Sequence, residues 1–105
     1  MDDAFEERRK KNEDKWALDE ALKFKALARR NKLLGLWAAA EMGLTPEEAG
    51  AYAKTVVAAD LRPGGVLAKV TADIAANGLS HGEDAIRRKM ADLLRLAQEQ
   101  VQAGI

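Results

Sequence analysis

The side chains that most often carry out chemistry are scarce in this chain. It has one histidine, His81, one serine, Ser80, and no cysteine. A nucleophilic hydroxyl needs a neighbouring base to activate it, and we predict that Ser80 instead caps a helix, with His81 exposed beside it. A Ser-His-Asp arrangement is therefore close to excluded. The lack of cysteine removes both thiol chemistry and disulfides.

Acidic side chains are numerous, but their spacing does not favour a catalytic or metal-binding site. They occur as neighbouring pairs, and neighbours splay around a helix instead of converging on one point. No spacing typical of metal ligands is present. We predict no catalytic residue, no metal site and no cofactor, so the chain is not expected to be an enzyme. Examples of such pairs are Asp2-Asp3, Glu6-Glu7, Asp19-Glu20 and Glu83-Asp84.

Two features could contact an anion. Gly64-Gly65 could present free backbone amides before a helix, but no Lys-Ser/Thr follows, and we interpret it as a turn. Arg29, Arg30 and Lys32 form a small basic cluster that could contact phosphate. We favour a solvent-facing edge with paired carboxylates for this cluster. Weak nucleotide binding stays open as an alternative.

The composition favours one soluble helical domain. The 105 residues are 48% hydrophobic and 32% charged, with two prolines and few aromatic side chains. A formal net charge of zero argues against a nucleic-acid partner. No apolar run approaches the roughly 20 residues that span a bilayer, and the first residues lack the pattern of a signal peptide. We expect a cytoplasmic protein without direct membrane insertion.

The apolar spacing predicts four helices with short connections. Good helix formers run from about residue 3 to residue 41, and Gly35 within this run would let another helix approach closely. A capping box at Thr45 and Glu48 opens the second helix, which ends near Leu61. The predicted fold is all-α, a small four-helix bundle with a long first helix whose N-terminal part is mobile or projecting.

The third and fourth helices are shorter. The third is expected over about residues 65–76, before the turn at Asn77-Gly78. A second capping box, from Ser80 to Glu83, is expected to open the fourth helix. Its inner stripe is predicted to contain Ile86, Met90, Leu93, Leu94, Ala97 and Val101.

Residues 1–25 can form helix but have few apolar side chains to bury. Fifteen of them are charged, eight acidic and seven basic. A helix of about 38 residues would extend roughly 57 Å, against roughly 18 to 30 Å for the later ones, so its first part would project. We divide the chain into a flexible N-terminal segment, residues 1–20, and a four-helix domain, residues 21–105.

Two aromatic rings stand out in the N-terminal segment. Phe5 and Trp16 are 11 residues apart, which places them on nearly one face of a helix. Such a helix could lie in a groove of another protein with the rings as anchors. The alternative is a solvated tail in which Trp16 merely caps the bundle.

The block from Phe24 to Ala39, with its Ala-Arg-Arg-Asn-Lys-Leu-Leu-Gly sequence, resembles a family of small alphaproteobacterial proteins. The family was formerly catalogued as a domain of unknown function. It is the zeta subunit, the inhibitor of the F1Fo ATP synthase. The resemblance covers essentially the whole chain. Its later segments are Tyr52 to Asp60, Pro63-Gly64 and Ile86 to Met90.

The resemblance implies a four-helix protein whose mobile N-terminal segment enters a catalytic interface between the alpha and beta subunits of F1, near the central gamma stalk, and stops ATP hydrolysis. It also implies peripheral association with the inner membrane through the ATP synthase. The positions that match the inhibitory stretch, together with Arg9, form the predicted partner-binding set. This set is Phe5, Arg8, Arg9, Glu13, Lys15 and Trp16.

Two positions depart from the family pattern. Asn12 stands where relatives commonly carry an aromatic residue, and Arg9-Lys10-Lys11 is more basic than expected. Loss of an aromatic anchor would weaken inhibition, because buried aromatic side chains carry much of an interface's binding energy.

Three other functions stay open from the sequence. One is a helical bundle that senses a nucleotide through the basic cluster or through Gly64-Gly65. The second is a general protein-interaction module without ATPase inhibition. The third is a nucleic-acid binder, which would require salt-dependent binding and which the neutral net charge argues against.

Overall fold

The computed structural model describes residues 19–105, and all regular structure in this range is helical. The four-helix, all-α prediction is confirmed for these residues, and α4 has the predicted bounds. The elements are α2 (Glu20–Glu41), α3 (Pro46–Ala58), the 3-10 turn η1 (Ala59–Leu61), α4 (Gly65–Ala76) and α5 (Glu83–Gln102).

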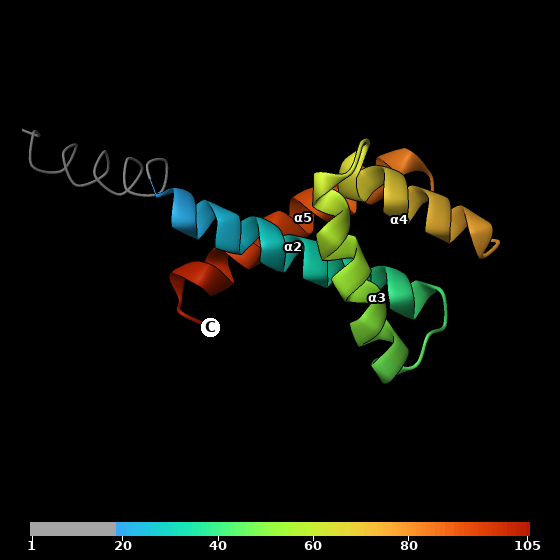
Figure 1. Ribbon diagram of the computed structural model, residues 1–105, viewed down its shortest axis with the longest axis horizontal. Helices are drawn as coiled ribbons and strands as arrows, with labels where there is room; N and C mark the ends of the chain where they lie inside the picture. Colours follow the sequence, from blue (N-terminus) through green and yellow to red (C-terminus); the bar gives the residue numbers. More distant parts are fainter. Residues whose placement is uncertain (1–18) are drawn as a thin grey trace, which may run out of the picture.

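Helix α2 is the central element of the domain. It packs most extensively against α3 and α5. Figure 1 shows α5 running beside α2, α3 crossing α2, and α4 at the end of the molecule away from the first turns of α2. The last part of α5 runs beside those first turns, and residue 105 lies near them (Figure 1).

Helix α2 begins at Glu20 because Asp19 caps it. The Asp19 backbone is non-helical, with φ −90° and ψ 89°, and its side chain accepts a hydrogen bond from the Leu22 amide at 3.1 Å. This bond satisfies one of the free N–H groups of the first turn. The run of good helix formers predicted over about residues 3–41 is thus seen as α2 from Glu20 to Glu41, and its earlier part lies outside the described residues.

The predicted capping box of α3 is confirmed. The Glu48 amide donates to Thr45 Oγ1 at 3.2 Å, and the Thr45 amide donates to Glu48 Oε1 at 2.9 Å. Pro46 occupies the first helical position, where its missing N–H costs nothing. The hydrogen bonds from Thr45 lower the pKa of the Glu48 carboxyl, since they favour its charged form.

The predicted capping box at Ser80 is wrong. Helix α5 begins at Glu83, and its N-cap is Gly82, which makes no side-chain hydrogen bond. Gly82 is extended, with φ −74° and ψ 163°, so the helix begins two residues later than a cap at Ser80 requires. His81 is half-buried against α2: its ring lies 5.5 Å from that of Trp37, and its Nε2 is 3.3 Å from Glu41 Oε2.

All four helices contribute to the hydrophobic core. The inner stripe predicted for α5 is confirmed, because each of its six residues is buried or half-buried. Trp37, Met90 and Leu93 pack around the fully buried cluster. That cluster is formed by Leu34, Ala38, Val56, Val66, Val70, Ile74 and Ile86.

Gly35 is the point of closest approach between α2 and α3. A Cβ atom built on Gly35 would lie 2.7 Å from the Cα of Ala53 and 3.2 Å from Cγ2 of Val56. Real Cβ atoms do not approach backbone so closely, so only glycine permits this crossing. The predicted packing role of Gly35 is confirmed.

A pair of Gly→Ala substitutions tests this crossing. Gly35→Ala should destabilise the protein by about 1–3 kcal/mol, because α2 and α3 must move apart. Gly50→Ala is the matched control: Gly50 lies in α3 with no atom within 4 Å of its added Cβ, and alanine there should stabilise by about 0.4–1 kcal/mol. Urea unfolding measures both. Equal effects of the two substitutions would contradict the close crossing.

A polar contact joins α3 to α4. Tyr52 donates its hydroxyl proton to Asp73 Oδ2 at 2.8 Å, and Lys69 Nζ donates to the same oxygen at 3.0 Å. The Lys69 ammonium also lies 5.2 Å from the centre of the Tyr52 ring. Partial burial raises the pKa of Tyr52, and the hydrogen bond and negative charge of Asp73 raise it further.

The Tyr52 pKa can be measured directly, because the sequence has no other tyrosine. Tyrosinate absorbance should appear at a higher pH than the value of about 10 for a free tyrosine. The raised pKa stabilises the fold below about pH 10, and this contribution is lost as the pH rises through the folded-state pKa. Asp73→Asn should lower the midpoint. A wild-type midpoint at or below the free value would contradict the contact.

Candidate partner-binding surface

The six residues predicted to bind the partner directly lie outside the described residues. Within residues 19–105, the surface nearest to them in the chain is formed by the first turns of α2. The six are Phe5, Arg8, Arg9, Glu13, Lys15 and Trp16.

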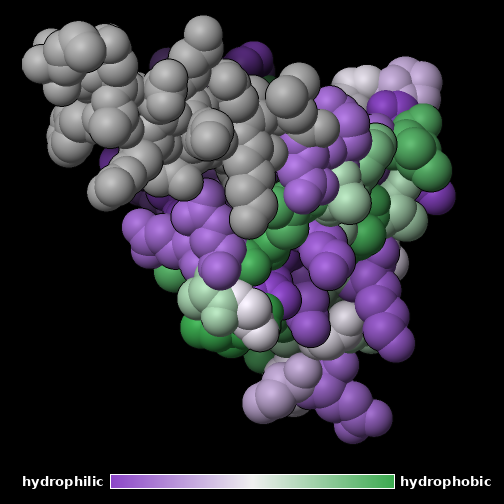
Figure 2. Space-filling view, turned by 90° about the vertical axis from the view of Figure 1, so that its left-hand side faces the viewer, coloured by the Kyte–Doolittle hydropathy of each residue, from purple (hydrophilic) through white to green (hydrophobic). Residues whose placement is uncertain are grey.

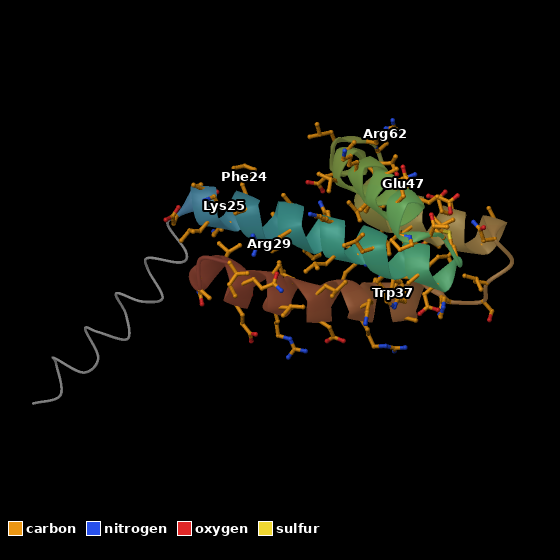
Figure 3. All side chains as sticks on the ribbon, turned by 90° about the horizontal axis from the view of Figure 1, so that it is seen from below. Phe24, Lys25, Arg29, Trp37, Glu47 and Arg62 are labelled. Atoms are coloured by element: carbon orange, nitrogen blue, oxygen red, sulfur yellow. The ribbon has the colours of Figure 1, made fainter. Side chains whose placement is uncertain are left out.

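Three cationic side chains form a row along α2 before its crossing with α3 at Gly35. Lys25, Arg29 and Lys32 are separated by four and three residues, which places them on one helix face. All three line one groove of about 510 Å³. Figure 3 shows Lys25 and Arg29 on the part of α2 that precedes the crossing with α3. The row is therefore presented at one end of the domain.

The rest of the groove is largely apolar. Val57 reaches it from the end of α3, and Val101 reaches it from the last turns of α5. The groove thus has charged side chains along one wall and aliphatic side chains along the others. Its remaining lining residues are Ala28, Gly104 and Ile105.

No ion pair within residues 19–105 neutralises the row. The expectation of paired carboxylates at Arg29 and Lys32 is therefore not met among the described residues. Like charges three and four residues apart destabilise a helix by a few tenths of a kcal/mol per pair. The ion pairs that the described residues form are Lys23–Glu20, Lys69–Asp73, His81–Glu41, Arg87–Glu83 and Arg95–Asp92.

Arg30 differs from its neighbours in the predicted basic cluster. Arg29 and Arg30 are both half-buried, but only Arg30 has a side-chain hydrogen bond within residues 19–105: its Nε donates to Oδ1 of the buried Asn31 at 2.9 Å. Desolvation lowers the pKa of Arg30, and the charge of Asp60 opposes this effect. Arg30 does not line the groove. The structure thus brings Arg29 and Lys32 together with Lys25, and it separates Arg30 from them.

Phe24 is the largest exposed apolar side chain on this part of α2. Its side chain is 68% exposed, and Leu27, three residues later, is 36% exposed. Figure 3 shows Phe24 on the same turns of α2 as Lys25. In the view of this end of the molecule in Figure 2, apolar surface lies directly beside hydrophilic surface. The surface therefore combines an exposed ring with cationic side chains.

The remaining candidate sites can be placed briefly. Gly64 and Gly65 both have positive φ, of 80° and 63°. Gly64 ends the predicted turn and is the N-cap of α4, and Gly65 is the first residue of that helix. Within residues 19–105, no group of three or more His, Asp or Glu side chains could hold a metal ion. None of the helices in this range combines the length and apolar character that a membrane-spanning helix needs.

The fold and this surface together define a small all-helical protein with an open groove lined by cationic side chains at one end. The model of the family ATPase inhibitor subunit zeta matches residues 1–100, and the chain belongs to this family. The resemblance seen in the sequence is thereby confirmed. A search of curated proteins found no significant match.

Adjacent arginines provide a test of the groove geometry. Arg29→Gln should leave stability unchanged or raise it by a few tenths of a kcal/mol, because it removes two like-charge contacts in the helix. Arg30→Gln should destabilise by about 1 kcal/mol, because Asn31 loses a charged donor. Thermal unfolding distinguishes the two. A larger loss of stability for Arg29→Gln than for Arg30→Gln would contradict the assignment.

Proposed function

We propose that this protein inhibits ATP hydrolysis by the F1 part of an F1Fo ATP synthase. The observation that carries the proposal is the family match over residues 1–100, which includes both the N-terminal segment and nearly all of the helical domain. As an inhibitor the protein acts by binding the enzyme, and its own residues need supply no catalytic group. It associates with the inner membrane only through the ATP synthase.

In this proposal the chain divides into an inhibitory segment, residues 1–20, and a supporting domain, residues 21–105. Two features of the described residues support the division. Asp19 gives α2 its own N-cap, and the buried core cluster is assembled from residues 34–86. The domain therefore has the helix start and the core that a stable fold needs without drawing on residues 1–18.

The inhibitory segment acts as a helical wedge at a catalytic interface between the alpha and beta subunits, next to the gamma stalk. Phe5 and Trp16 are its anchors, since buried aromatic rings dominate interface energies. Arg8, Glu13 and Lys15 find partners at the rim, where charges contribute more to orientation and association rate than to affinity. A wedge at this interface prevents the closing motion that each hydrolysis cycle requires.

Deletion of residues 1–17 tests the separate roles proposed for the inhibitory segment and the supporting domain. The truncated protein should keep its thermal unfolding midpoint within a few degrees, because the core and the Asp19 cap remain. It should no longer inhibit ATP hydrolysis by purified F1 from the same organism. Phe5→Ala and Trp16→Ala in the full chain should each weaken inhibition by about tenfold or more.

Leu61→Ala is the matched control for these aromatic truncations. Leu61 is 94% exposed in the turn after α3, so its truncation should change neither stability nor inhibition. Equal inhibition of F1 by the truncated and the full-length protein would reject the proposed roles of the two parts.

A further inference from the structure

We infer that the groove between α2 and the end of α5 docks an acidic, amphipathic segment of the ATPase. The inference rests on the proposed function and adds a second contact to it. In this arrangement the N-terminal segment inhibits, while Lys25, Arg29 and Lys32 hold the helical domain on the surface of the enzyme.

The charges of the groove point to an acidic partner. Three cations face one groove, and no carboxylate of residues 19–105 forms an ion pair with any of them. Their mutual repulsion opposes folding of the free helix. Carboxylates of a partner would relieve this repulsion and steer the encounter. Other cations of residues 19–105, such as Arg62 and Arg88, also form no ion pair within this range. Lys25, Arg29 and Lys32 differ from them because all three line the same groove.

The apolar walls indicate a polypeptide segment as the occupant. Val57 and Val101 line the groove opposite the cations, and the exposed Phe24 lies on the same turns of α2. A small anion would use the charges and leave these aliphatic side chains in water. A helix or strand with acidic residues on one edge and apolar residues on the other would bury both surfaces.

The position of the groove gives it a role in inhibition. It lies at the end of the domain where Asp19 starts α2, so it adjoins the junction with residues 1–18. Docking at this end holds the inhibitory segment close to the enzyme. The insertion of the segment then becomes an intramolecular step with a high effective concentration.

Charge reversal in the full-length protein tests the docking. Lys25→Glu combined with Arg29→Glu should raise the Kd for purified F1 by about tenfold or more. It should also flatten the dependence of binding on salt. The matched control is Arg62→Glu combined with Arg88→Glu, at two exposed arginines outside the groove. Figure 3 shows Arg62 far from Lys25. The control should change the Kd by less than about twofold.

Photo-crosslinking identifies the occupant. A photoreactive phenylalanine analogue in place of Ala28, an exposed residue that lines the groove, in full-length protein bound to F1, should attach to an ATPase segment that carries both carboxylates and apolar side chains. Attachment to a basic or uncharged segment would overturn the inference.

A nucleotide is the competing occupant of the groove. Titration of ATP or ADP into labelled full-length protein should leave the amide signals of residues 25–32 in place. Localised shifts of these signals, together with loss of F1 binding, would reassign the groove to nucleotides. If the wild type fails to inhibit F1, the proposed function fails. If it inhibits and the charge-reversed protein binds equally well, only the docking inference fails.

Discussion

Helix α2 is much longer than α3, the helix that crosses it, and this mismatch in length shapes the described domain. Its 22 residues extend about 33 Å, whereas the 13 residues of α3 extend about 20 Å and cross α2 at an angle. The crossing at Gly35 and Ala53 fixes which half of α2 is covered. Among residues 19–105, the first turns of α2 pack beside the end of α5. Phe24 lies on these turns, and the cationic row extends from Lys25 to Lys32.

The two halves of α2 accordingly show different physical chemistry. The second half presents Leu34 and Ala38 to the core and uses glycine to bring α3 close. The first half keeps a large aromatic ring in water and places like charges side by side. An exposed ring beside cations that no carboxylate of residues 19–105 pairs with contributes nothing to the stability of this part of the fold. This arrangement becomes favourable when a partner of opposite charge covers both the ring and the cations.

The sequence predicted the helices well where a local pattern determines them. Thr45, Pro46 and Glu48 together specify one helix start, and the small side chain at Gly35 indicated a close crossing. The pattern at Ser80 had the spacing of a capping box, but the extended Gly82 begins the helix later. Asp19 lies in a run of good helix formers, so its capping bond could be seen only in the structure.

The groove was predicted only in part. Arg29, Arg30 and Lys32 are close in sequence and appeared as one cluster, yet a helix turns Arg30 towards Asn31 and away from the other two. Lys25 is the last residue of the charged stretch 1–25, so the sequence pattern groups it with that stretch and not with Arg29 and Lys32. Its spacing of four and seven residues from Arg29 and Lys32 was the available signal. The contribution of Val101 depends on how α5 returns to α2, a long-range contact that no local pattern encodes.

Hydrogen–deuterium exchange of the full-length protein, alone and bound to F1, tests the central claim most directly. The claim is that this protein meets the ATPase through its N-terminal segment and the adjoining end of the domain. New protection on binding should appear in residues 1–18, in the first turns of α2 and in the last turns of α5. Protection confined to α4 and the turn before it, with residues 1–32 unchanged, would contradict the account.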